Sequence, residues 1–298
     1  RGKSAILSPE MGGLRFGYVS PDRSQYVRRG SIVRNSCFVC EPRRALSRLV
    51  LVFLASLALV WPGAMAVAQD IIVNHTGDPT TSGAALYSAM VEARNRLTTD
   101  EINIIVQSGE YWIRRATLAA DRLVPEDFTS GFPALGFSPA GEKVVRILGP
   151  AGATPTVVIR REPWPDTIPG ITDTYRFFTV QGGGNLTLEN VVLENGLADK
   201  GGAILLDDGE SLTLRDCIIR CNRAFSSGGG VFAKQSGPND DPLRRVSFEG
   251  VQFLNNIAET TQGGGAFVEN CRLDVLGGAF RCNQAPGSGG EGGGLYYN

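Results

Sequence analysis

Four tandem rows, each opening with alternating apolar residues and closing on a glycine pair, constrain the fold of this chain more than any other feature. The rows cover residues 186–206, 212–233, 246–268 and 273–297. Each row reaches one more apolar residue five positions after its opening: Leu193, Ile219, Phe253 and Phe280. The glycine pairs recur at intervals of 28, 35 and 29 residues, and 23 of the 38 glycines lie in residues 182–298. Such a period is typical of repeat architectures, in which each repeat stacks on its neighbours.

The apolar positions of each row have period 2, with no helical spacing between them, which predicts three short strands per coil. Strands of successive coils would pair in parallel about 4.8 Å apart. One coil cannot bury its inward face alone, so stacked neighbours supply the stability. We therefore predict an all-β fold, a right-handed single-stranded parallel β-helix, with regular coils over residues 186–298 that are truncated partway through a repeat. The polar segment 234–242 is expected to be an insertion between coils.

The repeated residues have structural roles in such a solenoid, and the apolar column named above would stack in its interior. Asn222, Asn256 and Asn283 stand three residues after that column in the last three rows, where the first row has Gly196. We expect these asparagines to form an amide ladder between coils. The paired glycines would provide positive φ at tight corners and allow close packing. No catalytic role is predicted for any repeated residue.

Residues 69–185 are expected to form an amino-terminal cap and irregular first coils. Asp70–Val73 favours a strand, and residues 76–79 favour a turn. A helix is predicted over residues 83–97, with one apolar stripe made of Leu86, Met90, Ala93 and Leu97. This amphipathic helix is the expected cap over the open end of the β-helix. Further strands are predicted at 102–106, 111–113, 144–148 and 156–160, with Pro-rich loops at 125–140 and 163–170.

Residues 1–68 are expected to be a leader that is removed on export. Three arginines between positions 43 and 48 precede an uncharged apolar run over residues 49–61, and an A-x-A segment follows. This order is typical of a secretory signal peptide, and we predict cleavage after Ala68, with Ala66 as the alternative. The 13 apolar residues extend only about 20 Å as a helix, too short to span ~30 Å of hydrocarbon.

The predicted mature part is acidic, with 19 Lys+Arg against 27 Asp+Glu and a net charge of −8. Such a charge disfavours binding to nucleic acid or to anionic lipid. The partners that we expect are an extracellular glycan or the surface of a host or neighbouring cell. We expect no nucleic acid partner and no membrane-spanning segment in the mature chain.

Segments before and within the rows match a known pattern. Residues 71–78 fit IxVNxxGD, residues 147–152 read ILGPAG, and residues 177–196 read FFTVQGGGNLTLENVVLENG. A Gly-Gly-Ala-Ile element stands at Gly201–Ile204, its variant Gly-Gly-Ala-Phe at Gly264–Phe267, and Phe-x-x-Asn elements stand at Phe253–Asn256 and Phe280–Asn283. Together these resemble exported β-helices of the pectin-lyase-like kind, and in particular the repeats of polymorphic outer-membrane proteins. The resemblance covers residues 69–298 and implies a surface-exposed or secreted passenger, often carried by a C-terminal β-barrel or another anchor.

Carbohydrate-active β-helix enzymes are the main alternative, because acidic side chains with a basic partner can hold Ca²⁺ or exchange protons. The residues to consider are Asp207, Asp208, Asp216, Asp240, Asp241, Arg244 and Arg245. Neighbouring aspartates on a strand point to opposite faces, so neither pair forms one site unless it lies in a turn. Asp240 and Asp241 are weak calcium candidates, and a solvated loop is the favoured reading because Ca²⁺ takes about six or more oxygens. No acidic residue is expected to recur in register over two coils beside an Arg or Lys.

His75 is the only histidine, which excludes a His-based triad or a multi-His zinc site within this sequence. The string Gly287-x-Gly289-x-x-Gly292 is not interpreted as a dinucleotide fingerprint, because no βαβ unit surrounds it.

The spacing of the cysteines restricts the disulfides that can form. Cys221 and Cys282 occupy the same register two coils apart, a distance of about 10 Å, which exceeds the ~7 Å that a disulfide can bridge. A Cys217–Cys221 bridge and four small buried thiols, formed by the cysteines after residue 68, are equally open.

These observations together predict a non-enzymatic, exported or cell-surface β-helix: an adhesin, a passenger or a structural stalk. It would have no cofactor apart from the weak calcium candidates. The alternative is a secreted polysaccharide lyase or glycoside hydrolase whose catalytic coils lie beyond residue 298. Acidic and basic residues clustered on one strand face over adjacent coils would favour the enzyme, whereas further glycine and asparagine columns would favour the passenger.

Overall fold

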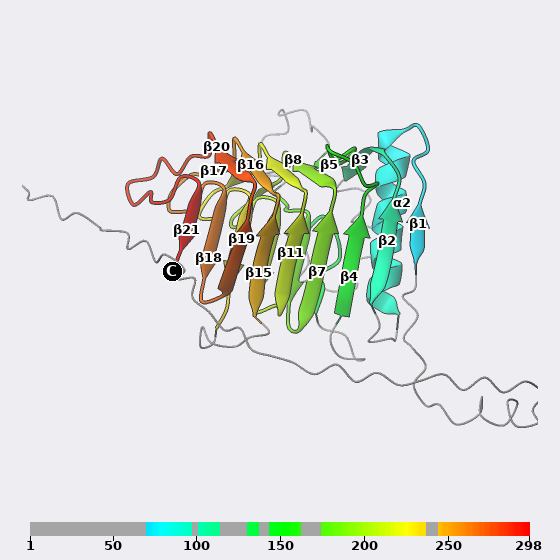
Figure 1. The fold of residues 1–298 in the computed structure, drawn as a ribbon, viewed down its shortest axis with the longest axis horizontal. Coiled ribbons are helices and arrows are strands. Elements are labelled where there is room, and N and C mark those ends of the chain that lie inside the picture. The colour runs from blue at the N-terminus through cyan, green and yellow to red at the C-terminus, as the bar shows by residue number, and fades with distance from the viewer. Residues whose placement is uncertain (1–69, 97–100, 114–129, 137–142, 162–173, 237–243) are drawn as a thin grey trace, which may run out of the picture. The chain divides into compact units, whose positions relative to one another are not determined.

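Strands of successive coils pair with one another in parallel, and this pairing dominates the computed structural model (Figure 1). The structure describes residues 70–96, 101–113, 130–136, 143–161, 174–236 and 244–298. The predicted leader with its cleavage site at Ala68 and the calcium candidates Asp240 and Asp241 lie outside these residues. So does Leu97, and so do most residues of the two predicted Pro-rich loops.

The described strands form four parallel sheets. The first sheet contains, in spatial order, β1 (Ile71–Val73), β2 (Ile102–Val106), β4 (Lys143–Leu148), β7 (Gly184–Glu189), β11 (Ser211–Arg215), β15 (Arg245–Glu249) and β19 (Arg272–Leu276). The second contains β3 (Gly109–Ile113), β5 (Val157–Arg161), β8 (Val191–Glu194), β12 (Ile218–Arg220), β16 (Gln252–Leu254) and β20 (Ala279–Arg281). The third contains β6 (Phe178–Gln181), β10 (Ile204–Asp207), β14 (Val231–Lys234), β18 (Ala266–Glu269) and β21 (Leu295–Tyr297). The fourth contains β9 (Leu197–Ala198), β13 (Arg223–Ala224) and β17 (Ile257–Ala258).

Each regular coil visits the sheets in turn, so that its strands pair with the corresponding strands of the next coil. The chain runs through β7, β8, β9 and β10 and then enters β11, which pairs with β7. This connectivity is that of a parallel β-solenoid and confirms the predicted parallel stacking. The prediction of three strands per coil was incomplete, because the two-residue strands of the fourth sheet are too short to show an alternating pattern.

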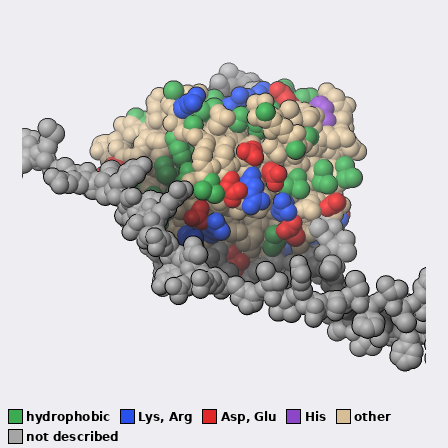
Figure 2. Space-filling model, in the orientation of Figure 1, with side chains coloured by type: hydrophobic (Ala, Val, Ile, Leu, Met, Phe, Trp, Pro, Cys, Tyr) green, Lys and Arg blue, Asp and Glu red, His purple; other side chains and the backbone are tan. Residues whose placement is uncertain are grey.

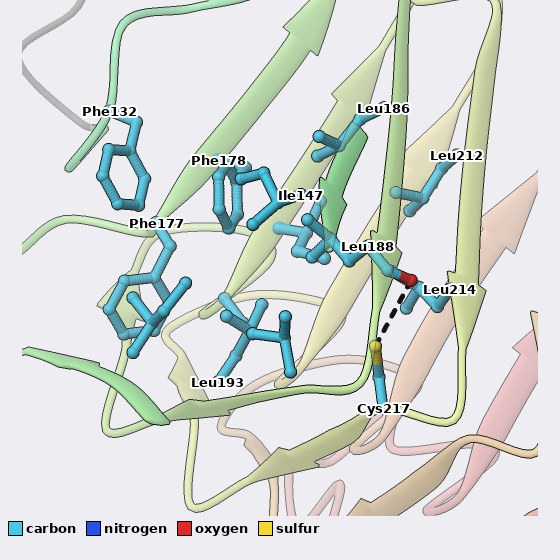
Figure 3. Close-up of a cluster of buried hydrophobic side chains, with 14 of the residues drawn as sticks. Phe132, Ile147, Phe177, Phe178, Leu186, Leu188, Leu193, Leu212, Leu214 and Cys217 are labelled. Atoms are coloured by element: carbon cyan, nitrogen blue, oxygen red, sulfur yellow. Dashed lines mark hydrogen bonds between the residues drawn. The ribbon is translucent and has the colours of Figure 1, made fainter. Parts of the chain in front are cut away.

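The predicted interior column is confirmed in the second sheet. Its members pair in succession from coil to coil: Leu193, Ile219, Phe253 and Phe280. The rings of Phe253 and Phe280 stack with their centroids 4.6 Å apart. Figure 3 shows Leu188 of the first sheet and Leu193 of the second pointing into the same cluster of buried side chains. Full burial of such a side chain contributes about 1.5–3 kcal/mol, which is why the inward positions are apolar.

The region before the repeat follows the same plan. Strands β1 to β5 fall where the sequence predicts them, with ends that differ by at most two residues. Tyr111 and Ile159 continue the interior column of the second sheet, because Tyr111 pairs with Ile159 and Ile159 with Leu193. The described strands of the first coils therefore share the register of the repeat.

Helix α2 (Pro79–Asn95) lies beside β1, β2 and β3 at the amino-terminal end of the stack (Figure 1). It starts four residues before the predicted position. The reason is a helix cap: Asp78 Oδ2 accepts a hydrogen bond from the Thr81 N–H at 2.8 Å, and Pro79 occupies the first helical position. Part of the predicted turn is thus the helix start. The described members of the apolar stripe are fully buried: Leu86, Met90 and Ala93.

The glycine corners differ from the predicted alignment by one residue in the first row. The interval of 28 residues between the first two glycine pairs would match Ala203 with Val231, but it is Ile204 that pairs with Val231. The first glycine of this corner, Gly201, has a φ of 58°. The second glycine of the corner meets a different constraint, which its counterpart in the following coil, Gly229, illustrates. A Cβ on Gly229 would overlap the carbonyl oxygen of Gly264. One glycine therefore turns the chain, and the other lets adjacent backbones stack closely.

Candidate functional surface

The asparagines predicted to form a ladder lie in one column and bond to one another. Asn222 Nδ2 donates to Asn256 Oδ1 at 3.0 Å, and Asn256 Nδ2 donates to Asn283 Oδ1 at 2.9 Å. The same Oδ1 atoms accept from the backbone N–H groups of Asn222 and Asn256, each at 3.0 Å. At the start of the column the Gly196 N–H donates to Asn222 Oδ1 at 2.8 Å. The amides are thereby committed to holding coils together and do not present themselves to a ligand.

The residue before each ladder position turns the chain in the left-handed region. Cys221 and Cys282 both have a φ of 54° at this corner and are exposed, whereas Cys217 is buried. All four described cysteines are free thiols, so the open alternative of a Cys217–Cys221 bridge is not realised. The alternative of four buried thiols is right for Cys217 and Cys271 and wrong for the two exposed cysteines, Cys221 and Cys282. Burial raises the pKa of the Cys217 thiol to about 12. The thiol donates a hydrogen bond to the Leu188 carbonyl oxygen, with Sγ and the oxygen 3.4 Å apart (Figure 3). A thiol in that state is not a nucleophile at neutral pH.

The acidic and basic residues singled out from the sequence are partly dispersed and partly drawn together. Asp208 and Arg244 both act electrostatically on Cys271, whose pKa is raised to about 12 chiefly by burial. Asp216 lies on a different corner, with a φ of 47°. Arg245 belongs to β15 and pairs with Asp274 at 2.6 Å. Within the described ranges, no group of three or more His, Cys, Asp or Glu side chains could hold a metal ion.

His75 fixes the loop between β1 and α2. Its Nδ1 accepts from the Gly77 N–H at 3.1 Å, which leaves Nε2 to donate to the Glu110 carbonyl oxygen, also at 3.1 Å. The imidazole meets the Tyr111 ring edge-on with centroids 5.5 Å apart. Both nitrogens are therefore occupied by backbone groups, and the side chain has a structural role.

The outer face of the third sheet carries a stack of aromatic rings. Phe232 and Phe267 lie 4.8 Å apart and nearly parallel, and Tyr296 continues the stack at 5.0 Å. The Lys200 ammonium lies 5.3 Å from the centroid of the Phe232 ring. Phe232 and Phe267 are almost fully buried, so this stack stabilises the face and offers little contact area.

Arg176 is a buried basic residue that precedes the third sheet in the chain. Burial lowers its pKa to about 10, although Asp199 and Asp207 oppose the shift.

The outer face of the first sheet carries intermixed charges. Figure 2 shows acidic and basic side chains side by side in the middle of this face, with hydrophobic ones toward the amino-terminal end. Glu189, Arg215 and Glu249 share one column, and Arg215 Nε donates to Glu249 Oε2 at 2.8 Å. That hydrogen bond lowers the pKa of Glu249 and raises that of Arg215. The pair therefore keeps both groups ionised.

The outer face of the second sheet carries a column in which arginine recurs. From the amino-terminal end its members are Trp112, Arg160, Glu194, Arg220, Leu254 and Arg281. Glu194 Oε2 accepts from Arg220 Nη2 at 2.6 Å and from Arg160 Nη2 at 3.3 Å. From the sequence we expected no acidic residue to recur in register beside an Arg or Lys. This expectation is wrong for the first sheet, where Glu189 and Glu249 flank Arg215. In the second sheet, Glu194 likewise lies between two arginines. The row comparison followed the inward positions and did not compare the outward ones, which the strand pairing aligns.

No helix within the described parts of the chain combines the length and the apolar character needed to cross a membrane. No family model matches the sequence, and comparison with curated proteins and with solved structures gave no match. The functional argument therefore depends on the faces of the solenoid and on the sequence motifs described above.

Proposed function

We propose that this chain is a non-enzymatic, exported or cell-surface β-helix, a passenger or stalk whose outer faces bind a partner. The observation that carries the proposal is that the repeated residues are already used in packing and in hydrogen bonds between coils. The asparagine amides bond to adjacent coils, and the inward column of Phe253 and its neighbours is buried. What stays exposed is an extended surface of outward columns. The resemblance of the glycine and Phe-x-x-Asn elements to polymorphic outer-membrane proteins supports the same location.

The finer architecture belongs to this proposal. We take the solenoid to be right-handed and pectin-lyase-like, with α2 as the cap over its open end. Support for the cap comes from the two sides of the helix, since Leu86 and Met90 are fully buried while Ser88 and Glu92 are exposed. A polar outer side would prevent the end of the solenoid from pairing with another molecule.

The experiment on location uses the full chain with residues 1–68 in place. Secretion followed by amino-terminal sequencing of the product should give a start at Gln69, because cleavage is expected after Ala68. The matched control is Leu57→Arg, which places a charge in the apolar run and should retain the protein in the cell. An intact leader on the wild-type product, or equal export of the variant, would refute the exported assignment.

The observation that favours a carbohydrate-active enzyme is the clustering of acidic and basic residues over adjacent coils, on the first sheet and in the column of Arg160, Glu194 and Arg220 on the second. These side chains bond to one another, with Glu194 Oε2 accepting from both arginines. On the first sheet the pKa of Glu249 is lowered and that of Arg215 is raised, which makes the former a poor general acid and the latter a poor base. Incubation with acidic polysaccharides should therefore give no unsaturated uronate product by ultraviolet absorbance, and its appearance would favour the lyase.

A further inference from the structure

We propose that the outer face of the second sheet binds a linear anionic glycan that carries a carboxylate or sulfate on every second sugar. This inference rests on the proposed extracellular location, where such polymers occur, and names the chemical class of the partner. The binding surface is the column that runs from Trp112 to Arg281, which we call the arginine column.

The spacing of the arginines is the first step. Arg160 pairs with Glu194 and Glu194 with Arg220, so the two arginines lie two coils apart. Arg220 and Arg281 are likewise separated by one coil, that of Leu254. Each interval is about 10 Å, twice the spacing between parallel strands. An extended glycan with a charge on alternate sugars presents that charge once per disaccharide, a repeat of similar length.

The state of the guanidinium groups is the second step. The Arg220 side chain is 40% exposed, whereas Glu194 between the two arginines is 14% exposed. Glu194 Oε2 accepts from Nε and Nη2 of Arg220 and from Nη2 of Arg160, so it orients both guanidinium groups, and the Nη1 atom of each takes no part in these bonds. Arg281 is exposed and has no ion pair among the described residues. Arginine binds carboxylate or sulfate through paired N–H donors, and a group already oriented loses less entropy on binding.

The residues between the charges are the third step. Leu254 lies between Arg220 and Arg281 in the column and is half-buried. It offers an apolar contact at the level where the uncharged sugar would lie. At the other end, the Trp112 indole donates from Nε1 to Glu110 Oε2 at 3.1 Å, which holds a flat ring beside Arg160. Amphipathic aromatic rings are suited to surfaces that are apolar on one side and polar at the edge, as sugars are.

A comparison with the first sheet shows why we assign the anionic glycan to the outer face of the second sheet. The comparable column of the first sheet alternates in sign, with Arg215 between Glu189 and Glu249. Arg215 is 41% exposed and bonds to one glutamate at 2.8 Å, so it closely resembles Arg220 as a single residue. It differs in having no further arginine in its column, which makes it a matched control.

The experiment measures binding of the complete exported chain to hyaluronate and unsulfated chondroitin, each of which carries a carboxylate on every second sugar, with dextran as the neutral polymer and single-stranded DNA as an unrelated polyanion. We expect both acidic glycans to bind, with affinity falling as salt rises because surface charges are screened. Arg220→Gln combined with Arg281→Gln should weaken binding about tenfold, the loss of roughly two charge-assisted contacts. Arg215→Gln should change it by less than about twofold.

Equal losses of affinity in the Arg215 variant and the double variant would overturn the inference, and so would DNA binding as tight as glycan binding. Either result would show that any polyanion is attracted to the basic side chains of this surface. Absence of binding to either acidic glycan would overturn it too. Thermal unfolding of each variant verifies that the fold is retained. Export and leader cleavage do not depend on the arginine column, so failure here is distinguishable from failure of the proposed location.

Discussion

The inward and outward columns of the same strands follow opposite rules. In β12 and β16 the inward residues, Ile219 and Phe253, are fully buried and lie in one apolar column. Their outward neighbours, Arg220 and Leu254, share a column in which charge and polarity change from coil to coil. Inward positions repeat because every coil must bury the same surface against the next one. Outward positions of this sheet are partly exposed and need not bury the same surface in every coil, and their variation is where a partner can be recognised.

The largest effect should follow a change in the inward column. Phe253→Ala removes a fully buried ring that stacks on Phe280 at 4.6 Å. The expected loss is about 3–5 kcal/mol of unfolding free energy, since the site combines lost transfer energy with a cavity. Urea denaturation followed by circular dichroism measures it. The outward control is Leu254→Ala, which should cost less than about 1 kcal/mol; similar losses at the two sites would remove the distinction between the faces.

The next effect concerns the polar part of the interior. Asn256→Ala deletes the acceptor of the Asn222 backbone N–H and of Asn222 Nδ2, and the donor to the Ile219 carbonyl. Several buried groups then lack partners, so we expect a loss of about 2–4 kcal/mol at about 1–3 kcal/mol for each unsatisfied group. Asn255→Gly is the control, because Asn255 is exposed at a φ of 55°, which glycine adopts readily. Chemical denaturation of both variants makes the comparison, and a stable Asn256 variant would contradict the role of the ladder.

How far the sequence predicts this molecule depends on which face is considered. The register of Leu193, Ile219 and Phe253 follows from the period-2 pattern, because burial demands similar residues in every coil. The fourth sheet was missed, since Leu197–Ala198 and its counterparts contain only two residues each. The start of α2 was placed too late because Pro79 was read as a turn residue and not as the first position of a helix.

The arginine column was missed because the rows were compared only at their inward positions. Arg160 lies before the repeat, and Arg220, Leu254 and Arg281 share no residue type that would draw attention to them. The strand pairing places them together. One signal was available, since the outward residue directly after each inward member of the column could have been compared across rows. The one-residue offset at Gly201 has a similar cause, because runs of two and three glycines can be aligned in two ways.

A smaller effect tests whether exposed corners are free to vary. Cys221 has a φ of 54°, a conformation that costs most L-residues about 1–2 kcal/mol but suits asparagine. Six of the eight described non-glycine residues with positive φ are Asn or Asp. Cys221→Asn should therefore raise the unfolding free energy by up to about 1 kcal/mol, measured by thermal and urea unfolding. Cys221→Val, which adds a β-branch at the same φ, should lower it. Equal stabilities would mean that this corner imposes no restriction on residue type.

The smallest effect concerns an outward ion pair and depends on pH. Glu249 has a pKa below its ordinary value of 4.5, chiefly because Arg215 donates a hydrogen bond to it. The folded state therefore binds this proton less readily than the unfolded state, so the contribution to stability is present above the ordinary carboxyl pKa and is lost as pH falls through the folded value. Because both side chains are partly exposed, Glu249→Gln should cost only about 0.2–1 kcal/mol at neutral pH. Urea midpoints of the wild type and the variant should converge in acid, below the range in which free glutamate titrates. A difference that persisted there would assign the effect to packing of the Glu249 side chain and not to its charge, which would bring this outward position closer to the inward ones.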